Sequence, residues 1–158
     1  MSDSSAPNPL VTTVGLSHIV MRVTDIDRSV AFYRDVLGMR LHKDARNVDA
    51  PGKARAVIGL VGDIAIEMIE VQPGEGEPTT RRGRDAAGYS TIAFTVADVA
   101  AALEVLKSRG LTRFPEVVTT ESGFKVMLFR DPDGNVLELI EFADARSLFD
   151  VATKATTH

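Results

Sequence analysis

Three ionisable side chains, His18, Glu67 and Glu138, have the types and the settings of a metal site. The two glutamates lie inside similar apolar stretches, IAIEMIEV (64–71) and NVLELIEF (135–142). In a strand, alternate side chains point to opposite faces, so each glutamate points away from its apolar neighbours. Two carboxylates held close together repel each other unless a cation or a proton lies between them. One neutral imidazole with two carboxylates is a donor set for Mn, Fe, Co, Ni or Zn.

Each of these residues has an ordinary structural interpretation when it is taken alone. A single histidine on a strand is more often structural than a ligand, and Glu67 could pair with Arg22. Glu70 and Glu141, on the same two stretches, are interpreted as solvent-facing carboxylates. The matched settings of Glu67 and Glu138 favour a shared site over two unrelated surface groups.

That match is part of an internal repeat. GLSHIVMRV (15–23) and GYSTIAFTV (88–96) share Gly, Ser, Ile and Val at equivalent positions. The offset that carries His18 onto Thr91 also carries Asp25 onto Asp98. Repeated units of this length must be recognised before the elements are assigned, because they decide the fold. The sequence therefore predicts two copies of one structural unit, with a histidine in the first copy and a threonine in the second.

Each copy is predicted to contain one strand, one helix and three further strands. Aspartate before each helix and glycine after it are typical start and stop signals. The first copy has strands at 15–23, 39–45, 54–61 and 64–71 and a helix from Asp25 or Asp27 to Gly38; the second has strands at 88–96, 111–118, 125–130 and 135–142 and a helix from Asp98 to Gly110. The expected fold is α+β, with two tandem βαβββ modules whose curled sheets surround a shared polar cavity.

The chain is divided accordingly into five parts. They are a disordered N-terminal extension (1–13), the first module (14–71), a linker (72–87) rich in Gly, Pro and charge, the second module (88–142) and a C-terminal tail (143–158).

The composition narrows the classes of function. The formal net charge of the 158 residues is −4, which argues against nucleic acid or an anionic membrane as the main partner. There is no cysteine, so disulfides, thiolate nucleophiles and thiolate metal sites are excluded. The N-terminus lacks a signal peptide, and no apolar run is long enough for a membrane span. We expect a soluble, cytoplasmic protein.

Two segments, HIVMRVTDIDRSVAFYRDVLGMRL (18–41) and FRDPDGNVLELIE (129–141), resemble glyoxalase I of the vicinal oxygen chelate superfamily. The resemblance extends over residues 15–142. It implies paired βαβββ modules in which the first and the last strand of each module supply one metal ligand apiece. These positions are His18 and Glu67 in the first module, and Thr91 and Glu138 in the second. Because a threonine hydroxyl is a poor ligand, the implied protein ligands are His18, Glu67 and Glu138.

The resemblance further implies a metal-dependent lyase, isomerase or epimerase acting on a small oxygenated molecule. Glu138 would remove a proton next to a chelated carbonyl, and Glu67 would help to return it. His18 would anchor the ion. Arg22 would bind an anionic group of the substrate, and Thr91 would donate a hydrogen bond to it.

Other functions remain open at this point. A metal-free binding protein of the bleomycin-resistance type would use the same cavity, with Tyr89 and Phe129 as lining rings. An extradiol dioxygenase would need a second histidine around Fe(II), for which His42 is the candidate. Val71 occupies the position where glutathione-dependent members carry asparagine, which argues against glutathione. A homodimer is expected, with the modules paired either within one chain or across two.

Overall fold

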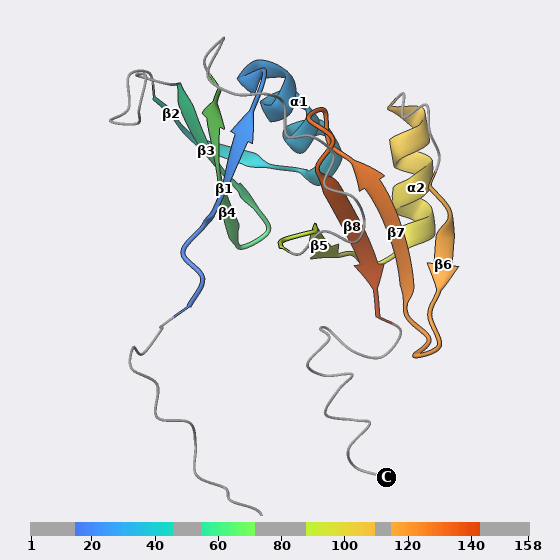
Figure 1. Ribbon diagram of the computed structural model, residues 1–158. Helices are drawn as coiled ribbons and strands as arrows, with labels where there is room; N and C mark the ends of the chain where they lie inside the picture. Colours follow the sequence, from blue (N-terminus) through green and yellow to red (C-terminus); the bar gives the residue numbers. More distant parts are fainter. Residues whose placement is uncertain (1–14, 46–54, 72–87, 110–114, 143–158) are drawn as a thin grey trace, which may run out of the picture.

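A computed structural model describes residues 15–45, 55–71, 88–109 and 115–142 (Figure 1). The predicted N-terminal extension, linker and C-terminal tail lie outside the described residues. So do Gly110 and the first part of the strand predicted at 111–118. In the described part of the chain, no helix is long and apolar enough to cross a membrane.

The elements follow the predicted order twice. The first module contains β1 (Ile19–Val23), α1 (Ile26–Leu37), β2 (Arg40–Ala45), β3 (Ala56–Val61) and β4 (Ile64–Glu70). The second contains β5 (Thr91–Thr95), α2 (Val99–Ser108), β6 (Val117–Thr119), β7 (Lys125–Arg130) and β8 (Val136–Glu141). The strand orders are β1-β4-β3-β2 and β5-β8-β7-β6, and in each sheet only the first pair is parallel. This confirms an α+β fold of two tandem modules.

The strand register confirms that the two modules are copies of one unit. Glu67 pairs across the parallel strands with the second residue after His18. Glu138 pairs in the same way with the second residue after Thr91. The two glutamates therefore occupy equivalent positions, and so do the histidine and the threonine.

Both helices begin as the sequence predicts. The carboxylates of Asp25 and Asp98 accept hydrogen bonds from backbone amides in the first turns of α1 and α2, which are otherwise unpaired. Gly38 ends α1 in the left-handed region, with φ of 68°, where a residue with a side chain is strained.

Glu70 and Glu141 correct one expectation from the sequence. They do not face solvent. Side chains alternate along each strand, so both glutamates lie on the same side as the apolar residues that face the helices. Glu70 accepts a hydrogen bond from the Ile26 amide at 3.1 Å, and Glu141 accepts one from the Val99 amide at 2.9 Å. Each carboxylate therefore joins the last strand of its module to the helix N-terminus, where negative charge is favourable. The pKa of Glu141 is lowered mainly by a hydrogen bond from Lys125 and, to a smaller extent, by the one from the Val99 amide.

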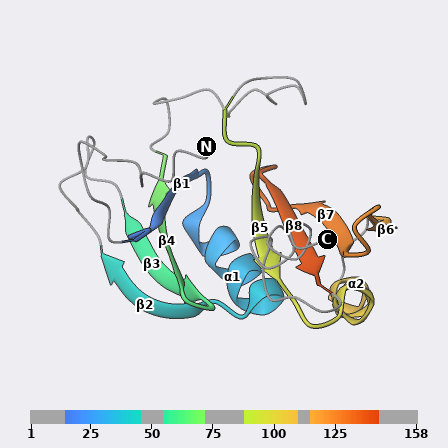
Figure 2. The ribbon, with the colours of Figure 1, turned by 90° about the horizontal axis from the view of Figure 1, so that it is seen from below.

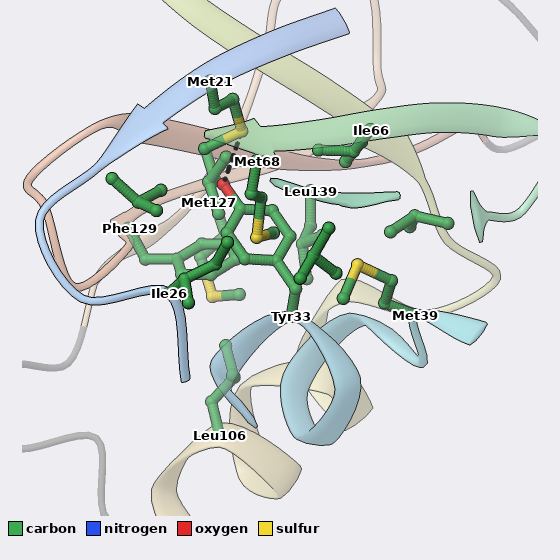
Figure 3. Packing of buried hydrophobic residues seen from close by; sticks show 14 of the residues in the cluster. Met21, Ile26, Tyr33, Met39, Ile66, Met68, Leu106, Met127, Phe129 and Leu139 are labelled. Atoms are coloured by element: carbon green, nitrogen blue, oxygen red, sulfur yellow. Dashed lines mark hydrogen bonds between the residues drawn. The ribbon is translucent and has the colours of Figure 1, made fainter. Parts of the chain in front are cut away.

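The two modules share one hydrophobic core (Figure 3). It contains the helix-facing side chains of both sheets together with α1 and α2, and Tyr33 lies at its centre. Its buried members are Met21, Val23, Ile26, Tyr33, Met39, Val57, Val61, Ile66, Met68, Val99, Leu106, Met127, Phe129, Leu137 and Leu139. Phe129 was expected to line a ligand cavity, and this expectation is wrong: it is 6% exposed and packs in the core. Alternation along β7 places it on the same face as Met127.

The turn between β7 and β8 joins the second module to α1. Buried Asp131 accepts hydrogen bonds from the Tyr33 hydroxyl at 3.1 Å and from two backbone amides of its own turn. Asp133 accepts hydrogen bonds from the hydroxyls of Thr24 and Ser29, the latter at 3.1 Å. Figure 2 shows the result: α1 lies between the two sheets. These bonds set how the modules sit relative to each other.

We predict that Tyr33→Phe lowers the free energy of unfolding by about 1.5–3 kcal/mol, because it removes a buried hydrogen bond to a charged group. Urea denaturation measures the effect. The matched control is Tyr89→Phe, the same change at the chain's other tyrosine, which is fully exposed. Equal losses in the two variants would contradict the importance of this contact.

We also predict that the same contact makes stability sensitive to alkaline pH. Burial, and then the charge of Asp131, raises the pKa of Tyr33 well above its ordinary value of 10.0. Above the ordinary pKa, the phenol ionises in the unfolded chain but stays neutral in the folded one. The stability of the fold therefore falls as the pH rises. The wild type should lose more stability than Tyr33→Phe between about pH 9 and pH 11. Equal losses of stability in the two proteins over this pH range would contradict the raised pKa of Tyr33.

Candidate functional site

His18 and Glu67 lie together on the face of the first sheet that points away from α1. The Nε2 atom of His18 is 3.5 Å from a carboxylate oxygen of Glu67. Two ligands of one first-row ion, each about 2.1 Å from it, are about 3.0–3.4 Å apart. The pair therefore fits two ligand positions of one metal ion with little movement. The side chains are 44% and 25% exposed, respectively, which leaves the pair open to a ligand from outside the chain.

One neighbour of this pair was not predicted from the sequence. The hydroxyl oxygen of Ser17 lies 2.9 Å from Nδ1 of His18. Ring nitrogens that do not bind the metal usually have such a partner, which holds the orientation of the imidazole. The only signal in the sequence is that the serine directly precedes the histidine. Alternation along a strand does not predict contact between two adjacent side chains.

Glu138 lies at the equivalent position of the second sheet, on the face that points away from α2. It pairs in register with Ala93 on β5 and with Leu128 on β7. Among the described residues, no three side chains of the His, Cys, Asp or Glu type are grouped so that they could hold a metal ion. One chain thus brings His18 and Glu67 together but does not add Glu138 to them. The reason is that the helix-facing sides of both sheets form the shared core. The opposite faces, which carry His18, Glu67 and Glu138, therefore point away from the core.

The other two predicted site residues are exposed on these same faces. Arg22 lies on β1, two residues beyond the register partner of Glu67, and Thr91 begins β5. In the described part of the chain, the Glu67 carboxylate lies next to His18, and no ion pair connects it to Arg22. His42, the candidate second histidine, is exposed on β2 where the register shifts.

The first site face is rich in positive charge. Arg40 and Lys43 on β2 pair in register with Leu60 and Ile58, which share the face of Glu67. Arg22 on β1 shares this face, and Glu67 is the single carboxylate that the described strands place on it. A face of this kind attracts anions although the whole chain carries a net charge of −4.

A hollow of about 560 Å³ lies elsewhere, beside the open edge of β5. It contains none of the five predicted site residues. It is lined by Val36, Leu37, Val61, Gly62, Asp63, Ile64, Ala93, Phe94, Thr95, Val96, Ala102 and Leu139. The hollow is formed between the modules of one chain, whereas the predicted site residues lie on the outer sheet faces.

Solved structures have the same arrangement of modules. The crystal structure of SMU.1112c matches with a TM-score of 0.68 and 29% identity, over 82% of this chain and 100% of that one. A fosfomycin resistance protein, FosX from Listeria monocytogenes, matches with a TM-score of 0.65 and 21% identity, over 91% of this chain and 99% of that one. That FosX crystal structure contains Mn(II) and 1S,2S-dihydroxypropylphosphonic acid.

Sequence comparison agrees with these likenesses. A lactoylglutathione lyase of Salmonella typhimurium is 33% identical over 131 residues, which are 82% of this chain and 94% of that protein. The model of the Glyoxalase/Bleomycin resistance protein/Dioxygenase superfamily matches residues 15–139, which cover all but the outer ends of the two modules and include all five predicted site residues. The chain belongs to this superfamily.

Proposed function

We propose that this protein is a divalent-metal-dependent lyase, isomerase or epimerase that removes a proton next to a carbonyl of a small oxygenated substrate. The observation that carries the proposal is the His18–Glu67 pair, with 3.5 Å between ligand atoms on an open sheet face. The equivalent position of Glu138 in the second module provides a third donor of the same kind. Names of relatives support the reaction class, since one is a lactoylglutathione lyase and the FosX structure contains Mn(II).

We propose further that the site is completed by a second copy of the chain. His18 and Glu67 of one copy would face Glu138 and Thr91 of the other. Val20 and Leu128, the register neighbours of Glu67 and Glu138, are 50% and 49% exposed. Large apolar side chains that flank a charged group on an open face are typical of a surface that is covered in the assembly. A twofold dimer would create two identical composite sites.

The residues then have distinct roles. A bound divalent ion would hold two substrate oxygens and stabilise negative charge as it develops on them. Glu138 takes the proton from the adjacent carbon, and the electron pair of that C–H bond moves toward the carbonyl oxygen. A water molecule held by Glu67 on the opposing face would return a proton to the carbon, and the proton on Glu138 would then neutralise the hydroxide that remains. His18 is a neutral ligand, which keeps the total charge of the site close to zero.

Arg22 and Thr91 would select the substrate. Arg22 has a permanent positive charge on a face that also carries Arg40 and Lys43, so it would bind a carboxylate or another acidic group. Thr91 would donate its hydroxyl hydrogen to a substrate oxygen at the place where the first module has the imidazole. Both side chains are exposed in the single chain and would be enclosed in the dimer.

We predict about one divalent ion per wild-type chain, measured by elemental analysis after loading with Mn, Fe, Co, Ni or Zn. Both His18→Ala and Glu138→Gln should lose most of this metal, because each removes one of three protein ligands. The matched controls are His42→Ala and Glu121→Gln, which change exposed residues that are not among the three proposed ligands and should retain it. A wild-type chain that takes up none of these metals would contradict the metalloenzyme and favour a binding protein.

Mixing the two deficient variants tests the composite site. In a mixed dimer, one site combines His18 and Glu67 from the Glu138→Gln chain with Glu138 from the His18→Ala chain. Random exchange of subunits makes half of the dimers mixed, and each mixed dimer has one intact site out of two. About a quarter of the wild-type metal content should therefore return. A site built within one chain would regain none.

We predict that the metal-loaded protein exchanges the hydrogen next to the carbonyl of its substrate with solvent deuterium. Proton NMR in D₂O would follow hydroxyacetone, lactaldehyde and S-lactoylglutathione, the last because of the name of the relative. Glu138→Gln should slow the exchange by roughly 100-fold or more, since a positioned general base contributes at least that much. Glu121→Gln should exchange at the wild-type rate. Exchange that persists in Glu138→Gln would exclude this residue as the base.

A further inference from the structure

We propose that Ser17 is a positioning residue that allows His18 to change tautomer when its site fills with metal. This inference rests on the proposed function. Its basis is the place of the imidazole between two different groups: Ser17 Oγ is 2.9 Å from Nδ1, and a Glu67 oxygen is 3.5 Å from Nε2. A neutral imidazole carries one N–H, so one of its nitrogens donates and the other accepts.

Without metal, the electrostatics favour the proton on Nε2. An ionised carboxylate can only accept hydrogen bonds, so the Nε2–H of His18 should point toward Glu67. Nδ1 then presents a lone pair, and the Ser17 hydroxyl donates its hydrogen to that pair.

With metal, the arrangement must reverse. Nε2 can bind a cation only through its lone pair, and the proton then belongs on Nδ1. The Nδ1–H would donate to the Ser17 oxygen, which now acts as the acceptor. A hydroxyl can act as donor or acceptor by rotating, whereas a carbonyl or a carboxylate can only accept. Ser17 can therefore serve both states of His18.

The repeat offers an internal control for this role. Ser90 occupies the position of Ser17 in the second module, directly before Thr91, which has no ring to orient. It is exposed in the structure. Ser90→Ala therefore makes the same change in an equivalent backbone setting without touching an imidazole.

The test combines a spectroscopic measurement with metal affinity. Long-range ¹H–¹⁵N NMR at a pH where imidazole is neutral would report the His18 tautomer, with His18→Ala used for assignment. We expect Nε2–H in the metal-free wild type and Nδ1–H after zinc is added. We also expect Ser17→Ala to bind zinc about 10-fold more weakly or worse, as is usual for partners of ligand imidazoles. Ser17→Thr, which keeps the hydroxyl, should restore the affinity.

The outcomes separate this inference from the proposed function. Wild-type affinity for zinc in Ser17→Ala, equal to that of Ser90→Ala, would overturn the role of Ser17 and leave the metal site standing. A single His18 tautomer in both states would also overturn it. A wild-type protein that binds no metal would overturn the proposed function, and this inference with it.

Discussion

The contact between the β7–β8 turn and α1 is the interaction on which the rest of the structure depends. Asp131 and Asp133 belong to the second module, but their carboxylates receive hydrogen bonds from hydroxyls of the first. The bond from Tyr33 is buried, and Tyr33 itself occupies the centre of the shared core. A buried carboxylate must be satisfied by donors, and Tyr33 of α1 adds one to the donors that the turn itself provides to Asp131. The contact thus determines which sides of the two sheets meet.

The consequence for function is that the site faces turn outward. The helix-facing sides of both sheets are used for the core, which leaves His18 and Glu67 on one outer face and Glu138 on another. Each face has a carboxylate beside an exposed apolar residue. This arrangement explains how a folded chain can carry the three predicted ligands without bringing them together, and it agrees with the proposed site between two copies.

The two modules share the contacts that hold their helices and differ on their outer sheet faces. Asp25 and Asp98 cap their helices in the same way, and Glu70 and Glu141 hold the same helix ends. The differences are on the outer faces. The first has an imidazole and several cations, whereas the second has hydroxyls, apolar side chains and one cation, Arg130. We infer that the first module provides two of the three proposed ligands and binds any acidic group, and that the second provides the third ligand, which is also the base.

The sequence by itself determined the repeat, the order of the elements, the helix caps and the placement of Glu67 and Glu138 on the faces opposite the helices. These properties follow from local alternation and capping, which depend on neighbouring residues only. The tertiary structure decided the rest. Phe129 lies in the core, and the turn at Asp131 joins the two modules. Contacts of this kind join residues about a hundred positions apart, and they depend on how two finished modules fit together, which no local pattern encodes.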